Sequence, residues 1–372
     1  MPSILVAPQE FKGSLTAREA AEAIARGIQR ALPDAEIELL PMADGGPGTV
    51  EALVEATDGT YLHADTHDPL GRPLSARWGA SGDTAFIEIS AASGLTLLAP
   101  DERDPRRATT AGTGELLRAA LDAGYRRLLV GVGGSATNDG GAGMAQALGA
   151  RLLDAAGDEL PPGGAALAEL ASIDIASLDP RVREAEVIVA ADVTNPLCGP
   201  QGASLVYGPQ KGASAAVAAE LDVALAHYAD VVQRDLGIDL AGVPGAGAAG
   251  GLAGGLIAFC GAKIRPGFEV VADAAGLAER LQRADLVITG EGRLDSQSAY
   301  GKVTAGMARV ARTAGKCVVA IAGSVSGDEA ARPFDHVFAL APDPAQADEA
   351  MARAAELLAD AAEAAGEWWR TR

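Results

Sequence analysis

The sequence predicts an α/β protein built from two α/β domains, and three observations support this prediction. The chain has 372 residues, more than a single hydrophobic core usually supports. Its composition is 48% hydrophobic but only 4% aromatic, which is typical of buried parallel strands covered by Ala-rich helices. Short apolar runs end in glycine-rich or polar turns and lead into helix-like segments, which is the pattern of open α/β sheets.

The two ends of the chain are predicted to form one discontinuous domain, residues 1–60 with 285–372. Thr16 and Glu19 form a capping box that opens a helix ending before Pro33. Because strands and helices alternate at both ends of the chain, we expect a mostly parallel, doubly wound sheet. The apolar strand patterns of this domain lie at 4–7, 37–40, 285–289, 317–322 and 336–340.

Residues 61–284 are predicted to form the second, inserted domain, of mixed α/β type. Three strand patterns follow one another with only short turns between them, so we expect them to pair as an antiparallel meander. A long helix is predicted over 215–236, whereas 151–185 indicates only a polar connection. The strand patterns of this domain lie at 61–66, 74–78, 85–89, 126–130 and 187–191.

Composition and charge exclude several classes of partner. The net charge is −20, from 30 basic and 50 acidic residues, which disfavours nucleic acid and anionic membranes. Cys198, Cys260 and Cys317 are too scattered for a zinc motif and indicate a reducing compartment. No secretory signal or apolar run of about 18–20 residues is present. We therefore expect a cytoplasmic protein without nucleic-acid or membrane partners.

The stretch 128–143 reads LLVGVGGSATNDGGAG and has the strongest site signal of any single segment. A strand that ends at clustered glycines and then becomes a helix can present backbone N–H groups to an anion. The alternative is a tight strand-to-helix turn that binds no ligand. The candidate binding residues in this stretch are Gly133, Gly134, Ser135, Thr137, Asn138 and Asp139.

Other predicted strands also end in polar side chains, at Lys12, Asp44, 192–195 and 291–295. The carboxyl ends of strands in open α/β sheets are where ligands bind. Phosphoryl transfer needs such a set: carboxylates for Mg²⁺ or as a base, and amides with a cation for the phosphates. Taken singly, each Asp is more typical of a turn or helix cap than of a ligand site, and Lys12 is equally typical of a solvated turn.

A series of motifs along nearly the whole chain resembles the bacterial glycerate kinase family. The resemblance implies ATP-dependent phosphorylation of D-glycerate with Mg²⁺. It also implies two α/β domains with the active site in the cleft between them. We expect a monomer or homodimer, a choice that the sequence leaves open. The matching stretches are APxxFKGSL at 7–15, DGGxGT at 44–49, GxGGSATNDGGAG at 131–143, DVxNPL at 192–197, GPQKG at 208–212, GAAGGL at 247–252 and ITGEGxLD at 288–295.

The resemblance and the strand-end positions together predict a role for each candidate residue. We expect a catalytic set, a set that binds nucleotide or substrate, and carboxylates that hold the metal. The catalytic residues are Lys12, Asp192 and Asp295; the binding residues are Gly133, Gly134, Ser135, Thr137, Asn138, Asp139, Asn195, Glu291 and Arg293; the metal ligands are Asp44 and Asp192.

This chain departs from the family pattern in two places. Gln9-Glu10 stands where the family usually has Asp-Ser, and Pro47 stands where it usually has Glu. These changes leave open a second hypothesis, a catalytically impaired binder or sensor of a small hydroxy acid. A third is an NAD(P)-dependent dehydrogenase, because GxGxxG at 245–250 matches the dinucleotide fingerprint without a clear strand before it.

Overall fold

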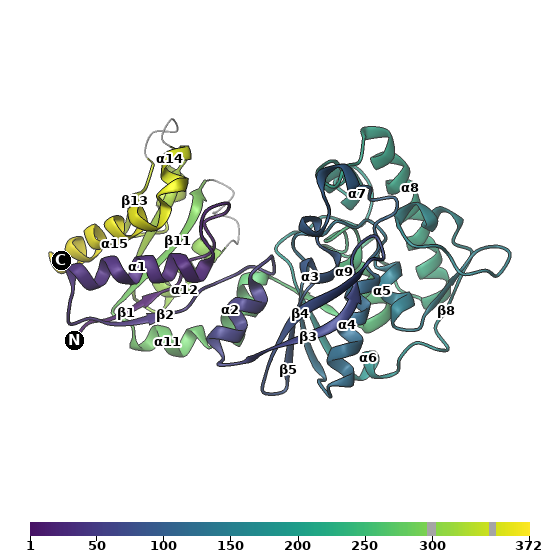
Figure 1. The fold of residues 1–372 in the computed structure, drawn as a ribbon, viewed down its shortest axis with the longest axis horizontal. Coiled ribbons are helices and arrows are strands. Elements are labelled where there is room, and N and C mark those ends of the chain that lie inside the picture. Colours follow the sequence, from purple (N-terminus) through teal and green to yellow (C-terminus); the bar gives the residue numbers. More distant parts are fainter. Residues whose placement is uncertain (296–302, 342–346) are drawn as a thin grey trace. The chain divides into compact units, whose positions relative to one another are not determined.

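The computed structural model describes residues 1–295, 303–341 and 347–372 and divides into two compact units. The first unit contains residues 1–44, 51–58 and 268–372, and the second contains 45–50 and 59–267. Each unit is built around its own sheet (Figure 1). The domain bounds inferred from the sequence, 1–60 with 285–372 and 61–284, stay a prediction.

The first unit has a five-stranded sheet in the order β13-β12-β11-β1-β2, and all of its strand pairs are parallel. Ile4 and Val6 of β1 face a core shared with two helices, while Leu5, on the opposite face, is equally buried. Burial on both faces confirms the doubly wound sheet and explains the continuous apolar runs. The strands are β1 Ser3–Val6, β2 Glu36–Leu39, β11 Leu286–Leu294, β12 Cys317–Val325 and β13 His336–Ala339.

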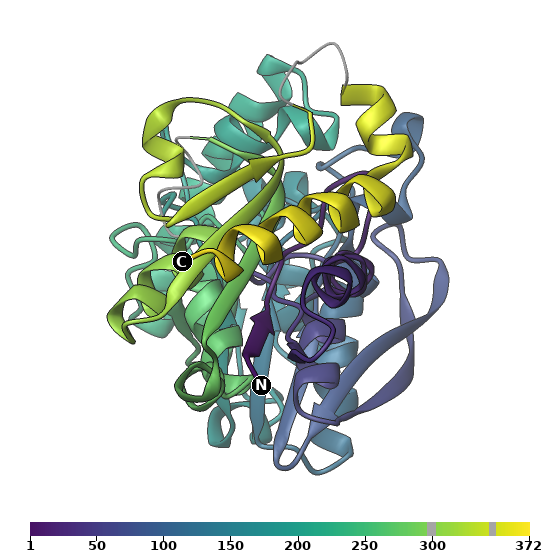
Figure 2. The ribbon, with the colours of Figure 1, turned by 90° about the vertical axis from the view of Figure 1, so that its left-hand side faces the viewer.

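Helices α1 (Ala17–Ala31) and α15 (Ala354–Arg370) lie side by side on one face of this sheet (Figures 1 and 2). The predicted capping box is present: Glu19 N donates to Thr16 Oγ1 at 3.2 Å, and Thr16 N donates to Glu19 Oε2 at 2.9 Å. The remaining helices of this part of the chain are α2 Thr49–Ala56, α10 Gly267–Ala274, α11 Leu277–Arg283, α12 Val303–Thr313, α13 Asp328–Ala331 and α14 Ala347–Ala352.

The second unit has a six-stranded mixed sheet in the order β10-β9-β6-β5-β4-β3. The pairs β3–β4 and β4–β5 are antiparallel, which confirms the predicted meander, and β5, β6, β9 and β10 pair in parallel. The strands are β3 Thr60–His67, β4 Pro73–Ser81, β5 Thr84–Glu88, β6 Arg127–Gly131, β9 Glu186–Ala190 and β10 Lys263–Arg265.

Helix α8 (Ala215–Leu236) has the bounds that the sequence predicts, because both of its ends are capped locally. Val217 N donates to the side chain of Ser214, and Gly237 ends the helix in the left-handed conformation. The other helices are α3 Ser90–Ser93, α4 Ala111–Asp122, α5 Ala142–Ala147, α6 Arg181–Glu184, α7 Ala203–Tyr207 and α9 Leu252–Cys260, with short 3-10 turns at Leu95–Leu97, Pro100–Glu102, Gly164–Glu169 and Pro209–Lys211.

The segment 151–185, predicted only as a polar connection, contains more structure than its pattern indicates. It forms the two-stranded antiparallel sheet of β7 (Arg151–Leu153) and β8 (Ser172–Asp174). Strands of three residues are too short to show an alternating pattern. Their position depends instead on tertiary contacts, such as the hydrogen bond from Ile173 N to Asp235 Oδ2 at 2.8 Å.

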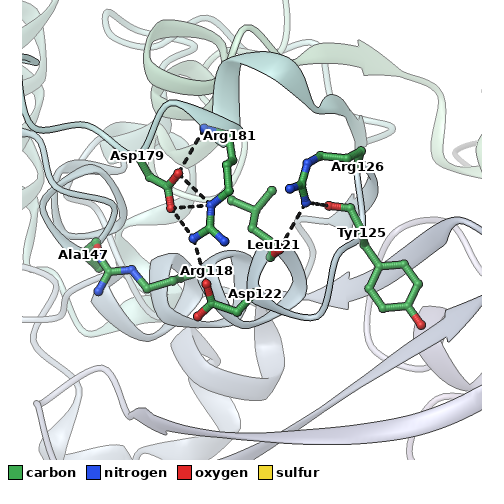
Figure 3. A network of polar contacts seen from close by, with 8 residues as sticks. All are labelled: Arg118, Leu121, Asp122, Tyr125, Arg126, Ala147, Asp179 and Arg181. Atoms are coloured by element: carbon green, nitrogen blue, oxygen red, sulfur yellow. Dashed lines mark hydrogen bonds and ion pairs between the residues drawn. The ribbon is translucent and has the colours of Figure 1, made fainter.

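A polar network joins α4 to α6 at the end of the second sheet where β6 begins (Figure 3). Arg181 pairs with Asp179 at 2.6 Å and with Asp122 at 2.7 Å. Arg126 donates to the carbonyl oxygens of Leu121 and Tyr125. A pocket of about 680 Å³ lies at the same end of the sheet, opposite to the strand ends with the polar motifs. It is lined by Gly82, Asp83, Ala123, Gly124, Tyr125, Arg126, Arg127 and Glu186.

No helix within the described ranges is long and apolar enough to cross a membrane.

The packing of α1 on α15 generates the first prediction. A Cβ atom on Gly27 would overlap the carbonyl group of Ala359 and lie 2.8 Å from the Cβ of Ala362. Overpacking of this kind costs about 1–3 kcal/mol, so Gly27→Ala should lower the free energy of unfolding by that amount despite the better helix propensity of Ala. Chemical denaturation measures the change.

The control is Arg26→Ala, which lies on the exposed face of the same helix and should change stability by less than about 0.5 kcal/mol. A Gly27→Ala protein as stable as the wild type would show that α1 and α15 pack less closely than described.

Candidate active site

The carboxyl end of β1 in the first unit holds a cluster of polar side chains from two predicted motifs. The pairing of β1 with β11 continues past its last residue, since Ala7 N donates to Ile288 O at 2.7 Å and Gln9 N to Gly290 O at 2.8 Å. Gln9 Nε2 then donates to Asp44 Oδ2 at 3.0 Å. Gln9, at one of the departures from the family pattern, therefore binds a predicted metal ligand.

Lys12 lies in the turn that follows and is exposed. Phe11, only 2% exposed, anchors this turn and accepts hydrogen bonds from Ser14 N and Leu15 N. Burial raises the pKa of the Glu10 carboxyl, the Lys12 cation lowers it and the Asp44 carboxylate raises it. Lys12 and Asp44 are thus both close enough to Glu10 to act on its charge, as expected for residues that share a strand edge.

The third motif of this unit, ITGEGxLD at 288–295, differs from the prediction in its secondary structure. Strand β11 runs to Leu294, so Glu291 and Arg293 lie within the strand rather than in a turn after residue 289. The glycines at 290 and 292 do not end the strand, because β12 remains paired alongside as far as Leu294. Arg293 Nε lies 3.3 Å from Asp295 Oδ2, and Glu291 is 7% exposed.

In the second unit, the glycine-rich loop leaves β6 and leads into α5, as predicted. Its first glycines pack directly on the backbone of the segment 45–46. Gly133 N donates to Gly45 O at 2.9 Å, and a Cβ on Gly133 would lie 2.5 Å from the Cα of Gly46. Only glycine permits so close an approach of two main chains.

Ser135 lies beside Gly94 in an isolated antiparallel bridge. The hydrogen bonds of this bridge run from Leu95 N to Gly134 O at 2.8 Å and from Ala136 N to Ser93 O at 2.9 Å. In such a non-hydrogen-bonded pair, the N–H of Ser135 points away from Gly94. Gly134 is exposed, with φ +74°, and Ser135 is 6% exposed. These residues form the part of the loop that lies nearest the surface.

The other predicted binding residues of the loop are buried, because Thr137, Asn138 and Asp139 are 0% exposed. The carboxylate of Asp139 accepts hydrogen bonds from Thr110 N at 2.8 Å, Thr110 Oγ1 at 2.9 Å, Gly141 N at 3.1 Å and Gly143 N at 3.2 Å. Burial raises the pKa of Asp139, and these hydrogen bonds oppose the rise. The contacts of the Asp139 side chain therefore fix the conformation of the loop and do not face a ligand.

Lys211 belongs to this site and was not among the residues predicted from the sequence. Its side chain is 2% exposed, and Nζ donates to Ser135 Oγ at 2.8 Å and to Thr137 O at 2.6 Å. Burial lowers the pKa of Lys211 to about 7, against the opposing effect of the Asp139 charge. The sequence signal was the motif GPQKG, in which the lysine stands in a tight turn ended by Gly212 with φ +94°.

Glu88, at the end of β5, is a second functional candidate that the sequence analysis missed. It is 8% exposed and accepts hydrogen bonds from Gly48 N and Val50 N, both at 2.9 Å. Burial raises the pKa of Glu88, and these two hydrogen bonds lower it. Glu88 thereby holds the DGGxGT segment, including Pro47, on the second unit. A carboxylate at the end of an apolar strand was the signal available.

Asp192 and Asn195 follow β9, and each has a structural contact of the kind that turn residues make. Asp192 Oδ1 accepts a hydrogen bond from Gly267 N at 2.6 Å, at the start of α10. Asn195 Nδ2 donates to Gln201 O, and its Oδ1 accepts from Tyr207, both at 2.8 Å. Their predicted catalytic and binding roles stay predictions.

The sequence raised two further kinds of binding, of a metal ion and of a dinucleotide, and the described residues bear on both. These residues contain no group of three or more His, Cys, Asp or Glu side chains placed to hold a metal ion. Mg²⁺ commonly uses only one or two carboxylates together with substrate phosphates and water, so a single carboxylate such as Asp44 in the first unit or Asp192 in the second has the chemistry of such a ligand. The GxGxxG stretch at 245–250 forms turns before α9 and follows no strand, so the dehydrogenase hypothesis lacks its structural context.

The fold and these strand-edge clusters define an α/β protein whose two units each carry ligand-type side chains at the carboxyl ends of strands. The chain belongs to the glycerate kinase family, whose model matches residues 4–370.

Relatives of known name match most of the chain. A glycerate 2-kinase of Escherichia coli K12 is 53% identical over 327 residues, covering 87% of this chain and 86% of that protein. A glycerate kinase of Bacillus subtilis is 49% identical, covering 95% of this chain and 94% of its own length. A crystal structure from Salmonella typhimurium LT2, assigned to a glycerate kinase 2, is 48% identical with a TM-score of 0.89 and covers 100% of this chain and 98% of that one.

Asp139→Asn tests the structural role of the buried carboxylate. In this variant an amide NH₂ group replaces one of the two carboxylate oxygens, each of which accepts hydrogen bonds in the wild type. The NH₂ group cannot accept those bonds, so buried N–H groups are left without a partner. We expect the free energy of unfolding to fall by about 1–3 kcal/mol. The exposed Asp158→Asn is the matched control and should unfold like the wild type in the same urea titration. Equal stability of the two variants would contradict the role assigned to Asp139.

Lys211 predicts a dependence of stability on pH. Its folded pKa of about 7 lies below its ordinary value of 10.5, so between these values the unfolded chain binds a proton that the folded chain does not. The free energy of unfolding should therefore rise with pH in this window, by up to about 1.4 kcal/mol per pH unit from this group. Asp139, with its raised pKa, acts with the opposite sign in a window that begins at 3.8.

The measurement is the difference in unfolding free energy between the wild type and Lys211→Met at pH 7, 8, 9 and about 10. Groups common to both proteins cancel in this difference. A difference that stays constant across the window would contradict the lowered pKa of Lys211.

Proposed function

We propose that the protein is a glycerate kinase, which transfers the γ-phosphoryl group of ATP to a hydroxyl group of D-glycerate and releases phosphoglycerate and ADP. Membership in the family and the names of the relatives support this proposal. The observation that carries it is the composition of the two strand edges. One supplies a cation and carboxylates, and the other supplies main-chain and hydroxyl donors, which together meet the needs of phosphoryl transfer.

In the first unit, Lys12 is proposed to neutralise charge on the transferring phosphoryl group. Asp44, hydrogen-bonded by Gln9, would contribute a carboxylate ligand to Mg²⁺. Asp192 is proposed either as a second ligand of the metal or as the base of the reaction. When bound, Mg²⁺ would neutralise phosphate charge and order the phosphate oxygens. Asp295 is proposed as a further catalytic carboxylate, with Glu291 and Arg293 in substrate binding.

In the second unit, Gly134 and Ser135 are proposed to hold anionic oxygens of ATP or glycerate. The exposure of Gly134 and the direction of the Ser135 N–H support this role. Gly133, whose N–H donates to Gly45 O, is proposed to serve the binding site by allowing the close approach of the main chains. Thr137 and Asn138 are proposed to act through the shape of the loop, as Asp139 does. Asn195 would serve the same strand edge through its contacts with Tyr207 and Gln201.

The proposed chemical step is an in-line transfer. A hydroxyl oxygen of glycerate forms a bond to the γ-phosphorus as the bond from that phosphorus to the bridging oxygen of ADP breaks. Asp192 is proposed as the base that accepts the hydroxyl proton. A positioned general base contributes about 10²–10⁴ in rate.

We also propose that the enzyme works in the cytoplasm on small molecules. The cysteines Cys198, Cys260 and Cys317 are all free, which supports a reducing compartment. The net charge of −20 disfavours polyanionic partners. The state of assembly, monomer or homodimer, and the position of the active site in a cleft stay predictions.

The test of the activity is a coupled assay of ADP release with MgATP and a panel of small hydroxy acids. We expect turnover with D-glycerate, and ³¹P NMR of the product identifies which hydroxyl is phosphorylated. Binding of glycerate without turnover would instead support the impaired binder, and turnover only with another hydroxy acid would replace glycerate as the substrate.

Asp192→Asn tests the proposed base. The variant should lower kcat by about 10²–10⁴, because an amide cannot accept the proton. It retains a side-chain oxygen that can accept the hydrogen bond from Gly267 N, so the start of α10 should stay capped and thermal stability should change little. Asp158→Asn, an exposed change in the same unit, is the control. A near-normal kcat for Asp192→Asn would rule out this residue as the base.

A further inference from the structure

Lys211 has a buried amino group directly behind Ser135 in the glycine-rich loop. It ends the 3-10 turn Pro209–Lys211 between α7 and α8 and is 2% exposed. Its two hydrogen-bond acceptors, Ser135 Oγ at 2.8 Å and the carbonyl oxygen of Thr137 at 2.6 Å, both belong to that loop. The residues concerned lie 76 and 74 positions apart in the chain, so this contact joins two distant motifs.

The contact determines how Ser135 can act. A serine hydroxyl has one proton to donate and lone pairs that accept. Because the amino group of Lys211 donates to Oγ, and also to Thr137 O, the proton of Ser135 must be directed elsewhere, and no acceptor for it occurs among the described residues. The N–H of Ser135 also points away from its bridge partner Gly94. Ser135 thus has two donors that its neighbours in the loop do not use.

The loop is fixed around Ser135 by other buried polar contacts. Asn138 Nδ2 donates to Ser204 Oγ of α7 at 2.8 Å, so α7 and the turn with Lys211 are tied to the same loop. Two buried oxygens, Thr137 Oγ1 and Asn138 Oδ1, nevertheless have no hydrogen-bond partner in the described part of the chain. Groups of this kind cost stability, which indicates a loop shaped for more than folding.

We propose that Lys211 is a positioning residue that holds Ser135 so that its hydroxyl and backbone N–H are both presented to an anionic oxygen of the substrate. The inference rests on the proposed function, which places an anion of D-glycerate or ATP at this loop. A carboxylate oxygen and a phosphate oxygen share the required chemistry, since each accepts hydrogen bonds from both donors.

The experiment compares Lys211→Met, Ser135→Ala and the double variant with the wild type in the ADP-release assay. KM for D-glycerate and KM for MgATP are measured separately. We expect each single change to raise KM for one of the two substrates by about 10- to 100-fold, the effect of losing a hydrogen bond to a charged group. A smaller change in kcat would mark a loss of binding rather than of chemistry.

The double variant distinguishes positioning from two independent effects. If Lys211 acts through Ser135, the KM of the double variant should be no higher than that of the more impaired single variant, because all three changes remove the same interaction. Independent effects would multiply instead and would overturn the proposal. A rise in KM for D-glycerate identifies the carboxylate as the bound anion, and a rise in KM for MgATP identifies the phosphate.

Lys263→Met, an exposed lysine of the same unit, is the matched control and should leave both KM values unchanged. If Lys211→Met does not fold, as judged by circular dichroism, Ser135→Ala decides, since it leaves the buried lysine in place. A folded Ser135→Ala protein with both KM values unchanged would overturn the proposal.

Failure of the proposed function would be recognised separately. If the wild type shows no turnover of glycerate, D-glycerate and MgADP are titrated calorimetrically into the wild type and Ser135→Ala. Weaker binding of either ligand to the variant would support the role of Lys211 and Ser135 even without kinase activity. Equal binding to both proteins, or binding of neither ligand to the wild type, would overturn it.

Discussion

The carboxylate of Asp139 is the contact on which the ligand edge of the second unit depends. It gathers donors from Thr110, at the start of α4, and from Gly141 and Gly143, where the loop enters α5. A fully buried charge is tolerated only when its hydrogen bonds are satisfied, so these three positions are fixed together. These contacts therefore also fix the positions of Gly134 and Ser135, which belong to the same loop. Lys211 holds that loop through its hydrogen bonds to Ser135 Oγ and Thr137 O.

Much of the fold was predictable because its signals are local. The apolar strands, the capping box at Thr16 and the ends of α8 each depend on neighbours within a few residues. The prediction was wrong where distant partners decide the structure. Strand β11 continues through two glycines because β12 pairs with it as far as Leu294. The strands within 151–185 are too short to be recognised without the α8 residue Asp235 that holds them.

The candidate site was predictable as a set of strand ends but not as a set of contacts. Sequence alone could not separate Ser135, near the surface, from the fully buried Asp139 four residues later, because both are small polar residues in a glycine-rich run. Glu88 and Lys211 were missed because their partners are remote in sequence. The two partners of Glu88 are separated from it by 38 and 40 positions in the chain, and Ser135 is separated from Lys211 by 76 positions. Such pairs become visible only once the chain has folded.

The packing of Gly133 against Gly45 and Gly46 has a consequence for how this protein can diversify. Main chain meets main chain there, and the added Cβ at Gly133 has no room. That part of the edge is therefore a fixed template, common to any ligand it accommodates. A new substrate preference, whether from evolution or from laboratory redesign, must come from side chains at the same strand edge, such as Ser135 and Asp192. A library aimed at another hydroxy acid would do best to vary those borders and leave the glycines untouched.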